Sequence, residues 1–269
     1  MFNQRMLTVI VLVPILVLLI MLGGWALTLI LSGLMAIAGW EFWRLFKAGG
    51  YTPSLVLLSG GTAAVLLAFA FFGFTGSQIA LAVLVLLAMG RSVFSFERQQ
   101  TTQPASDFVI TLGGILYLGW LAIFILALRR LPNGEWWMLT ALPAIWLADG
   151  GAYLFGRKNG RHKMAPRSSP KKSWEGYIAG VLFGAVGTMG LALLWGLRAP
   201  EITPLRGLLL GAVISTLAPL GDLGESVLKR QFGIKDSGTL FPGHGGVLDR
   251  ADSTLWAGVI GFLMISLLW

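Results

Sequence analysis

The sequence contains no cysteine and few charged residues, and each shortage excludes a class of protein. Without cysteine among its 269 residues, the chain has no disulfide, no thiolate metal ligand and no cysteine nucleophile. Only 12% of the residues are charged and 56% are hydrophobic, whereas about a quarter of the residues of a soluble domain are charged. So few charges cannot cover a soluble globule. A soluble globule, a disordered chain and a nucleic-acid-binding module are therefore excluded, and an integral membrane protein is expected.

Several widespread catalytic motifs are also missing. The sequence has no G-x-x-x-x-G-K-[ST] phosphate-binding loop and no G-x-G-x-x-G following a strand. It has no G-x-S-x-G nucleophile motif and no H-E-x-x-H zinc motif. The sequence therefore gives no support to a P-loop enzyme, a dinucleotide-binding enzyme, a serine hydrolase or a zinc protease.

Long apolar runs fill most of the chain. A helix needs about 20 mainly apolar residues to cross a bilayer. Nine runs approach this length, at 6–22, 25–43, 54–73, 77–93, 108–128, 136–156, 176–197, 205–224 and 253–269. Gly23 and Gly24 separate the first run from the second, and the short turn from Gly73 to Gly76 separates the third from the fourth, which predicts two tight hairpins. The expected fold is all-α, a polytopic integral membrane protein with about nine transmembrane helices.

The basic residues are distributed unevenly over this predicted topology. With nine crossings, sixteen of the twenty Lys and Arg residues lie on the same face as the N-terminus. Basic loops stay on the cytoplasmic side, so this face is expected to be cytoplasmic. Most acids lie on the same face, and mixed charge indicates a functional site more than an anchor for anionic lipids. The expected location is the bacterial inner (cytoplasmic) membrane, with the active site facing the cytoplasm.

Two polar segments, 148–176 and 221–252, are rich in Gly, Ser, Lys, Arg and Asp. Exposed backbone N–H groups, cations and helix N-termini together suit a site for polyphosphate. We therefore expect residues 131–269, with cytoplasmic loops 157–176 and 225–252, to form a catalytic membrane region. Residues 1–130, holding the first five spans, are expected to form an N-terminal membrane region.

The acids in these segments are candidates for catalysis. Asp149 lies inside a predicted span and Asp222 in the last turn of another, and carboxylates at membrane depth are usually functional. For Asp222 alone, a helix-end acid facing water explains the position equally well. Asp222 with Asp236, Asp249 and Asp252 in a short basic loop suits Mg²⁺, which prefers carboxylate, water and phosphate oxygens. The cations expected to bind anionic substrates are Lys229, Arg230, Lys235 and Arg250.

Two further features stand near these acids. His244, in the run P-G-H-G-G, can hydrogen-bond a phosphate or transfer a proton, although such a residue can also simply cap a loop. Gly180 and Gly184 have the G-x-x-x-G spacing, which indicates close packing of membrane helices.

The second polar segment resembles the signature of the phosphatidate cytidylyltransferases. The resemblance covers 27 residues, in the order Ser226-Val-Leu-Lys229-Arg230, Lys235-Asp236-Ser-Gly238, Pro242-Gly-His244-Gly245-Gly246 and Asp249-Arg250-Ala-Asp252. Asp149 and the stretch from Ser169 to Gly176 resemble the conserved upstream region of the same family. The chain departs from the family pattern at Ala251, where a larger apolar residue is usual, and at Gly150 and Gly151, where a hydroxyl residue is common.

This resemblance implies a reaction in which CTP and phosphatidic acid give CDP-diacylglycerol and pyrophosphate. It implies Mg²⁺ on Asp222 and Asp249, with Asp149 and Asp252 as further candidate ligands, and leaves open a second, monovalent cation such as K⁺. The implied catalytic residues also include Lys229, Arg230, Lys235, Asp236, His244 and Arg250, and Ser169, Lys172, Ser173, Gly245 and Gly246 are expected near the nucleotide. The implied partners are CTP, phosphatidic acid, membrane lipids and a second copy of the chain, with no nucleic acid.

Two other functions stay open at this level. A sibling enzyme could transfer the cytidylyl group to another membrane lipid phosphate, because acyl-chain selection would lie in generic apolar helices. A transporter or channel for an anion or a divalent cation would also have many spans and intramembrane acids. Against a transporter, the charges lie in two loops at one predicted face, with few along a path between the faces.

Overall fold

The computed structural model describes residues 13–238 and 245–269. The chain divides into two compact units. The first unit holds the described residues up to Leu126 together with Gln231–Ala251, and the second holds Ala127–Arg230 and Asp252–Trp269. Each unit is therefore built from two separate stretches of the chain.

Apolar helices make up most of the described residues. Seven of them are long and apolar enough to cross a membrane, namely Gly24–Ala48, Val56–Glu97, Pro104–Arg130, Gly134–Asn159, Trp174–Trp195, Pro204–Gln231 and Leu248–Leu268. A shorter apolar helix occupies Val13–Leu22. All nine predicted runs are helical over nearly all their described length. The all-helical membrane architecture is confirmed, while nine crossings and their orientation stay predictions.

Two glycines break the helices of the first unit where the sequence predicts turns. Gly23 has φ 57° and ψ −145°, and it precedes α2 (Gly24–Ala48). Gly73, inside α3 (Thr62–Glu97), has φ 63° and ψ −152°. Glycine alone adopts this backbone region readily. The chain reverses at Gly73, so that the two arms of α3 lie side by side. Their contact is close, since a Cβ placed on Gly61, before the first arm, would meet Leu84 on the second arm.

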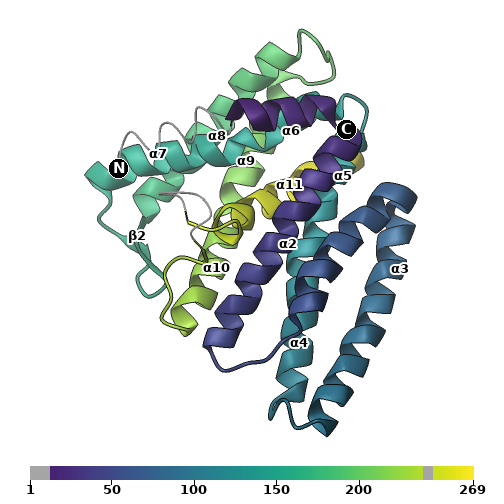
Figure 1. Ribbon diagram of the computed structural model, residues 1–269. Helices are drawn as coiled ribbons and strands as arrows, with labels where there is room; N and C mark the ends of the chain where they lie inside the picture. Colours follow the sequence, from purple (N-terminus) through teal and green to yellow (C-terminus); the bar gives the residue numbers. More distant parts are fainter. Residues whose placement is uncertain (1–12, 239–244) are drawn as a thin grey trace. The chain divides into compact units, whose positions relative to one another are not determined.

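The core of the first unit lies between α2, α3 and the segment formed by α4 (Pro104–Gly114) and η2 (Ile115–Trp120), which continues into α5 (Leu121–Arg130) (Figure 1). The short segment η1 (Val56–Gly61) leads into α3 and packs in the same place. Leu58, Leu66, Phe69 and Ile115 are fully buried there. This packing leaves the outer face of the α3 hairpin apolar, as a lipid-facing surface requires.

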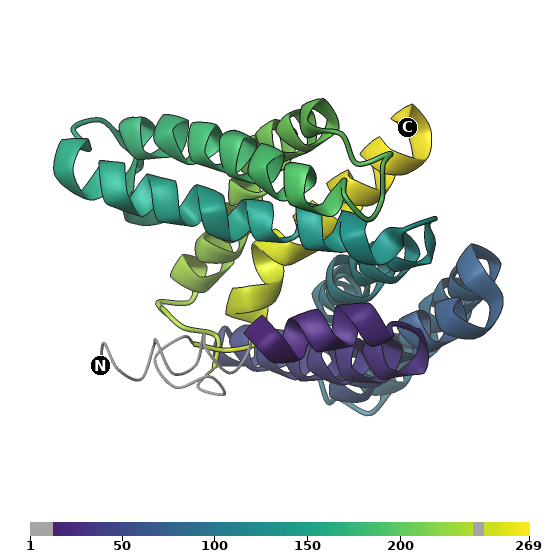
Figure 2. The same ribbon diagram turned by 90° about the horizontal axis from the view of Figure 1, so that it is seen from above.

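The second unit packs its helices through small residues. It contains α6 (Gly134–Ala141), α7 (Pro143–Asn159), α8 (Trp174–Trp195), α9 (Pro204–Leu217) and α10 (Pro219–Gln231). Figure 2 shows α7 and α8, in teal and green, lying along each other. Gly180 of α8 lies against Ala148 of α7, and Gly184 lies against Ser215 of α9. The packing role predicted for Gly180 and Gly184 is confirmed, since a Cβ at either position would overlap a neighbouring helix.

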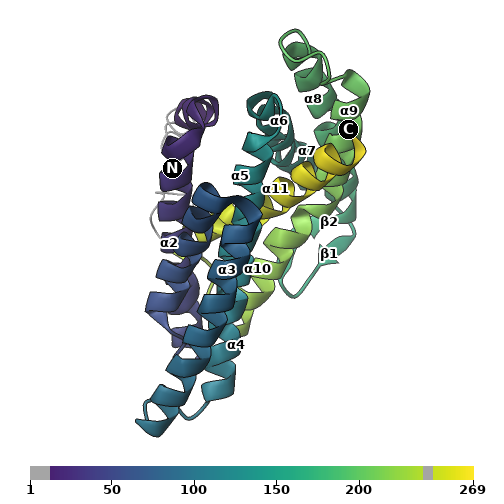
Figure 3. The ribbon, with the colours of Figure 1, turned by 90° about the vertical axis from the view of Figure 1, so that its right-hand side faces the viewer.

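A small β-hairpin connects α7 to α8, where the sequence predicts only a loop. Strand β1 (Lys163–Ala165) pairs antiparallel with β2 (Ser169–Ser173), with Lys163 opposite Ser173 (Figure 3). The strands are joined by only three residues, which antiparallel pairing permits. The second strand leads directly into α8, since β2 ends at Ser173 and α8 begins at Trp174.

The boundaries of the second polar segment differ from those predicted. Helix α10 continues to Gln231 and α11 (Leu248–Leu268) begins earlier than expected, so α10 and α11 are separated by 232–247 and not by 225–252. Asp222 lies in the first turn of α10 and not in the last turn of a span. The hydropathy of the sequence detects only the apolar part of a helix, whereas Pro219 starts a new helix and Glu, Leu, Lys and Arg extend it.

Candidate active site

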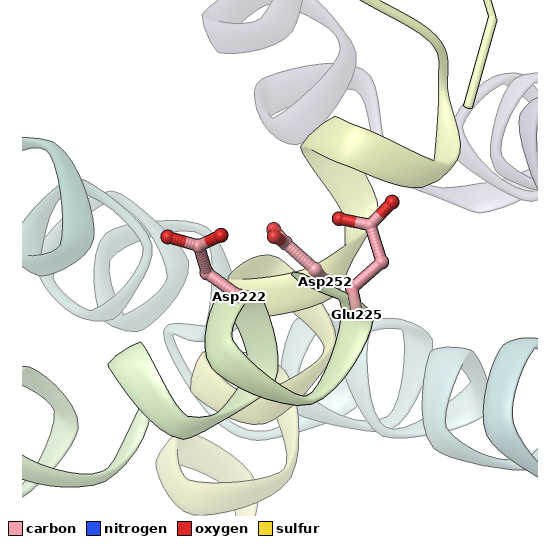
Figure 4. A group of neighbouring side chains, drawn as sticks. All are labelled: Asp222, Glu225 and Asp252. Carbon is pink, nitrogen blue, oxygen red and sulfur yellow. The ribbon is translucent and has the colours of Figure 1, made fainter. Parts of the chain in front are cut away.

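Three carboxylates meet in the second unit. Asp222 and Glu225 lie on α10 and Asp252 lies on α11, and one oxygen of each is within 4.8 Å of the others. Figure 4 shows Asp252 reaching between the two acids of α10. Glu225 is 2% exposed and Asp252 is 6% exposed. The three-residue spacing places Asp222 and Glu225 on one face of α10, and Gly221 lets the backbone of α11 approach that face closely.

Two lysines accompany these carboxylates. Lys172 Nζ lies 2.6 Å from Asp222 Oδ2, and Lys229 Nζ lies 3.1 Å from Glu225 Oε2. Lys229 is itself buried. Three carboxylates in partly buried positions repel one another unless cations balance them. This group of three carboxylates, which we call the acidic cluster, therefore favours a further positive charge beside it.

The β-hairpin brings Lys172 to the acidic cluster. Ser173, the next residue, is buried and caps α8, because its Oγ accepts a hydrogen bond of 3.2 Å from the backbone N–H of Gly176. Arg230 of α10 donates from Nε to the carbonyl oxygen of Ser168, at 3.2 Å. The hairpin is thus attached to both α8 and α10, and Ser169 lies within it on β2. The expected approach of Ser169, Lys172 and Ser173 to a nucleotide stays a prediction.

Asp249 organises the signature segment in the first unit. Its Oδ2 accepts hydrogen bonds from the backbone N–H of Ser237 at 3.0 Å, from the Ser237 hydroxyl at 2.9 Å and from the backbone N–H of Gly246 at 2.8 Å. The predicted metal ligand therefore also serves as an acceptor for the residues that precede it. Its predicted role in metal binding stays a prediction.

Sequence reasoning missed two acids that the structure places beside signature residues. Glu225 belongs to the acidic cluster, and its position three residues after Asp222 on a helix was the available signal. Glu41 is 1% exposed and contacts Ser237, Val247 and Leu248 within the first unit. An acid inside the apolar run 25–43 was the available signal, since acids at membrane depth usually have a functional role.

The remaining predicted residues occupy different settings. Asp149 is exposed in the middle of α7 and is not one of the three acids of the cluster. Lys235, Asp236 and Arg250 are exposed. Asp236 lines a cavity of about 400 Å³ beside the end of α2, within the first unit. Gly245 and Gly246 lie against the carboxylates of Asp249 and Glu41 respectively. His244 lies outside the described residues.

Comparison with known proteins decides the family. A model of the cytidylyltransferase family matches residues 3–268, which is nearly the whole chain. The chain belongs to the cytidylyltransferase family. The resemblance seen in the two polar segments is confirmed and extends through the first five predicted spans, which carry no recognisable motif of their own.

Relatives of this cytidylyltransferase align along most of its length. A protein of Synechocystis sp. is 32% identical over 303 residues, covering 99% of this chain and 97% of the relative. A Bacillus subtilis protein is 32% identical over 281 residues, covering 98% of both chains. A Mycobacterium bovis protein is 34% identical over 236 residues, covering 84% of this chain and 75% of the relative. All three carry the name phosphatidate cytidylyltransferase. The chain is therefore a nucleotidyltransferase enzyme.

Proposed function

We propose that this enzyme transfers CMP from CTP to phosphatidic acid. A phosphate oxygen of phosphatidic acid attacks the α-phosphorus of CTP and forms a new P–O bond. The bond between the α-phosphorus and the oxygen that bridges to the β-phosphorus breaks, and pyrophosphate leaves with that oxygen. The products are CDP-diacylglycerol and pyrophosphate, which fits a role in phospholipid biosynthesis.

The observation that carries this proposal is the similarity, over almost the full chain, to relatives that bear the name of this activity. The acidic cluster and its lysines support it, because a site for two polyanions needs both cations and oxygen ligands for a metal. The same helices are long and apolar enough to cross a membrane. A site carried on such helices can receive a lipid substrate from the bilayer and a water-soluble nucleotide from the adjacent solution.

We further propose that the acidic cluster binds Mg²⁺. The donor set fits the ion, because Asp222, Glu225 and Asp252 offer three hard oxygen ligands close together. Asp249 is retained as a proposed ligand on the resemblance. When bound, Mg²⁺ would neutralise phosphate charge and favour departure of pyrophosphate. The residues of the chain would hold the ion, and no proton transfer to a protein group is required.

The lysines are proposed to bind phosphate groups of the substrates. Lys172 and Lys229 each contact a carboxylate of the cluster, so a bound metal would release them to attract substrate oxygens. Arg230 borders the same face of α10 and is partly held by Ser168. Positioning and charge neutralisation of this kind supply most of the catalysis in phosphoryl-type transfer.

The proposed reaction can be tested with purified full-length protein in nanodiscs. Wild-type protein given phosphatidic acid, Mg²⁺ and CTP labelled at the α-phosphate should form lipid-extractable label and release one pyrophosphate for each product molecule. Omitting phosphatidic acid or chelating Mg²⁺ should abolish both signals. A well-folded protein that forms no labelled lipid would contradict the proposal.

Two further measurements identify the acceptor lipid and test the competing functions. Isoprenoid phosphates and other lipid phosphates should compete weakly with phosphatidic acid, and a preference for one of them would identify a sibling activity. Flux of anions or divalent cations into proteoliposomes without CTP would instead support a transporter.

A further inference from the structure

The buried acid of α2, Glu41, gathers hydrogen bonds from the signature segment. Its Oε1 accepts from the backbone N–H of Val247 at 3.1 Å, and its Oε2 accepts from the backbone N–H of Leu248 at 2.8 Å. Its Oε2 also lies 3.1 Å from the hydroxyl of Ser237. All four residues belong to the first unit. A side chain 206 positions from Val247 in the sequence thus makes contacts that a local helix cap usually makes.

Two of these contacts lie at the beginning of α11. The first N–H groups of a helix have no partner within the helix, and a carboxylate beside them is favoured by the helix dipole. Leu248 is the first residue of α11 and Val247 precedes it. Glu41 therefore caps the N-terminus of α11, which begins one residue before Asp249.

The third contact connects Glu41 to Asp249 itself. The Ser237 hydroxyl lies 3.1 Å from Glu41 Oε2 and 2.9 Å from Asp249 Oδ2. A hydroxyl has one proton to donate, so the Ser237 hydroxyl lies within hydrogen-bond distance of both carboxylates and donates to one of them at a time. Ser237 and Gly246 also donate their backbone N–H groups to Asp249 Oδ2. Asp249 is held in one orientation by residues that Glu41 holds in turn.

Two glycines of the signature make room for this carboxylate. A Cβ placed on Gly238 or on Gly246 would overlap the oxygens of Glu41. Gly246 is buried between Glu41 and the Ser237 hydroxyl. Part of the glycine content of the signature is thus explained by packing around a carboxylate from α2.

We infer that Glu41 is a positioning residue for the reaction, acting on Asp249 through Ser237 and the segment 245–248. Its influence on turnover rests on the proposed function, and its influence on the segment does not. A purely structural cap would stabilise the protein without changing turnover. A positioning residue changes both the segment and the rate of the folded enzyme.

The test compares Glu41→Gln with Asp107→Asn in the full-length protein. The glutamine would keep the size of the side chain but place an NH₂ group against an N–H or hydroxyl donor. Asp107 is a matched control, because it is another buried acid of the first unit and accepts hydrogen bonds from the backbone N–H and the hydroxyl of Thr52, at 2.6 Å and 2.7 Å. Neither of these bonds involves Ser237 or the segment 245–248.

Hydrogen–deuterium exchange and steady-state kinetics are measured on both variants. Glu41→Gln should speed exchange at Val247 and Leu248 about tenfold or more and lower kcat about 10- to 100-fold, as expected for loss of hydrogen bonds to a charged group. The KM for CTP should change little. Asp107→Asn should leave the exchange of 245–249 and kcat within about twofold of wild type. Unchanged exchange in a folded Glu41→Gln protein would overturn the inference, as would unchanged kcat.

A second variant covers the case in which Glu41→Gln does not fold. Ser237→Ala removes the shared hydroxyl and keeps both caps on α11, and it should lower kcat about tenfold. Wild-type kcat in Ser237→Ala would then assign Glu41 a structural role only. Failure of the proposed function is recognised separately, because wild-type protein would then form no CDP-diacylglycerol while the exchange of the segment could still be compared.

Discussion

At the scale of single residues, the acidic cluster concentrates like charge in a partly buried place. Asp222, Glu225 and Asp252 lie close together, and Glu225 and Asp252 are buried. Holding carboxylates of like charge close together in buried positions costs free energy unless cations offset the repulsion. A protein retains such an arrangement when function needs it, and bound cations are the usual reason.

Because of this repulsion, removing one carboxylate is expected to lower the activity without lowering the thermal stability. Asp252→Asn should lower the rate of CDP-diacylglycerol formation by about 100-fold or more, because a proposed metal ligand is lost. The same change relieves repulsion with Asp222 and Glu225, so the Tm without Mg²⁺ should be equal to or higher than that of wild type. Rates from labelled CTP and thermal unfolding in detergent check both parts.

The control for this substitution is Glu97→Gln, at an exposed acid that ends α3. It should leave both the rate and the Tm unchanged. A rate near that of wild type in Asp252→Asn would remove Asp252 from the metal site.

At the scale of elements, single glycines decide where helices break. An apolar run alone does not say whether the 42 residues of Val56–Glu97 form one helix or two arms, since the hydropathy is high throughout. Gly73 decides it, through a backbone conformation that residues with a Cβ avoid. The sequence could predict this break because the glycines stand out in the run.

Substitution of this glycine should therefore weaken the hairpin. Gly73→Ala is expected to destabilise the protein by about 1–3 kcal/mol, since it forces a Cβ into a strained conformation. Gly90→Ala is the matched control, because Gly90 lies in the second arm of α3 and a Cβ there meets nothing within 4 Å. Gly90→Ala should be neutral or slightly stabilising. Equal Tm values for the two variants would contradict the role of Gly73.

Helix ends were predicted less well than helix centres. The predicted spans ended where polar residues begin, yet α10 runs on to Gln231 and carries Lys229 and Arg230 on its last turn. Hydropathy measures transfer into lipid, whereas helix formation depends on backbone hydrogen bonds that polar side chains also support. The β-hairpin 163–173 was missed because its strands are short and polar, without an alternating apolar pattern.

At the scale of the whole molecule, the proposed orientation rests on the distribution of basic residues. Helix α8 has 22 residues, which is about the length needed for one crossing. Arg167 precedes this helix and Arg198 follows it, and both are exposed. A single crossing by α8 would place these two residues on opposite sides of the membrane.

The absence of cysteine makes this orientation directly measurable. In single-cysteine variants, Arg167→Cys should react with a membrane-impermeant maleimide only after the membrane is opened, and Arg198→Cys should react in intact cells. Retained CDP-diacylglycerol synthesis in each variant is the control for correct insertion. The reverse labelling pattern would overturn the cytoplasmic placement of the basic loops.

The sequence by itself determined the membrane class, the positions of the apolar helices and the signature segment, because composition, run length and motif spacing are local properties of the chain. Only the tertiary structure decided which charges meet. Asp222 and Asp252 come from different helices, and Glu41 lies 207 positions from Leu248, and no local pattern encodes contacts across such separations. Helix packing brings these groups together, since buried polar groups in apolar surroundings must find partners.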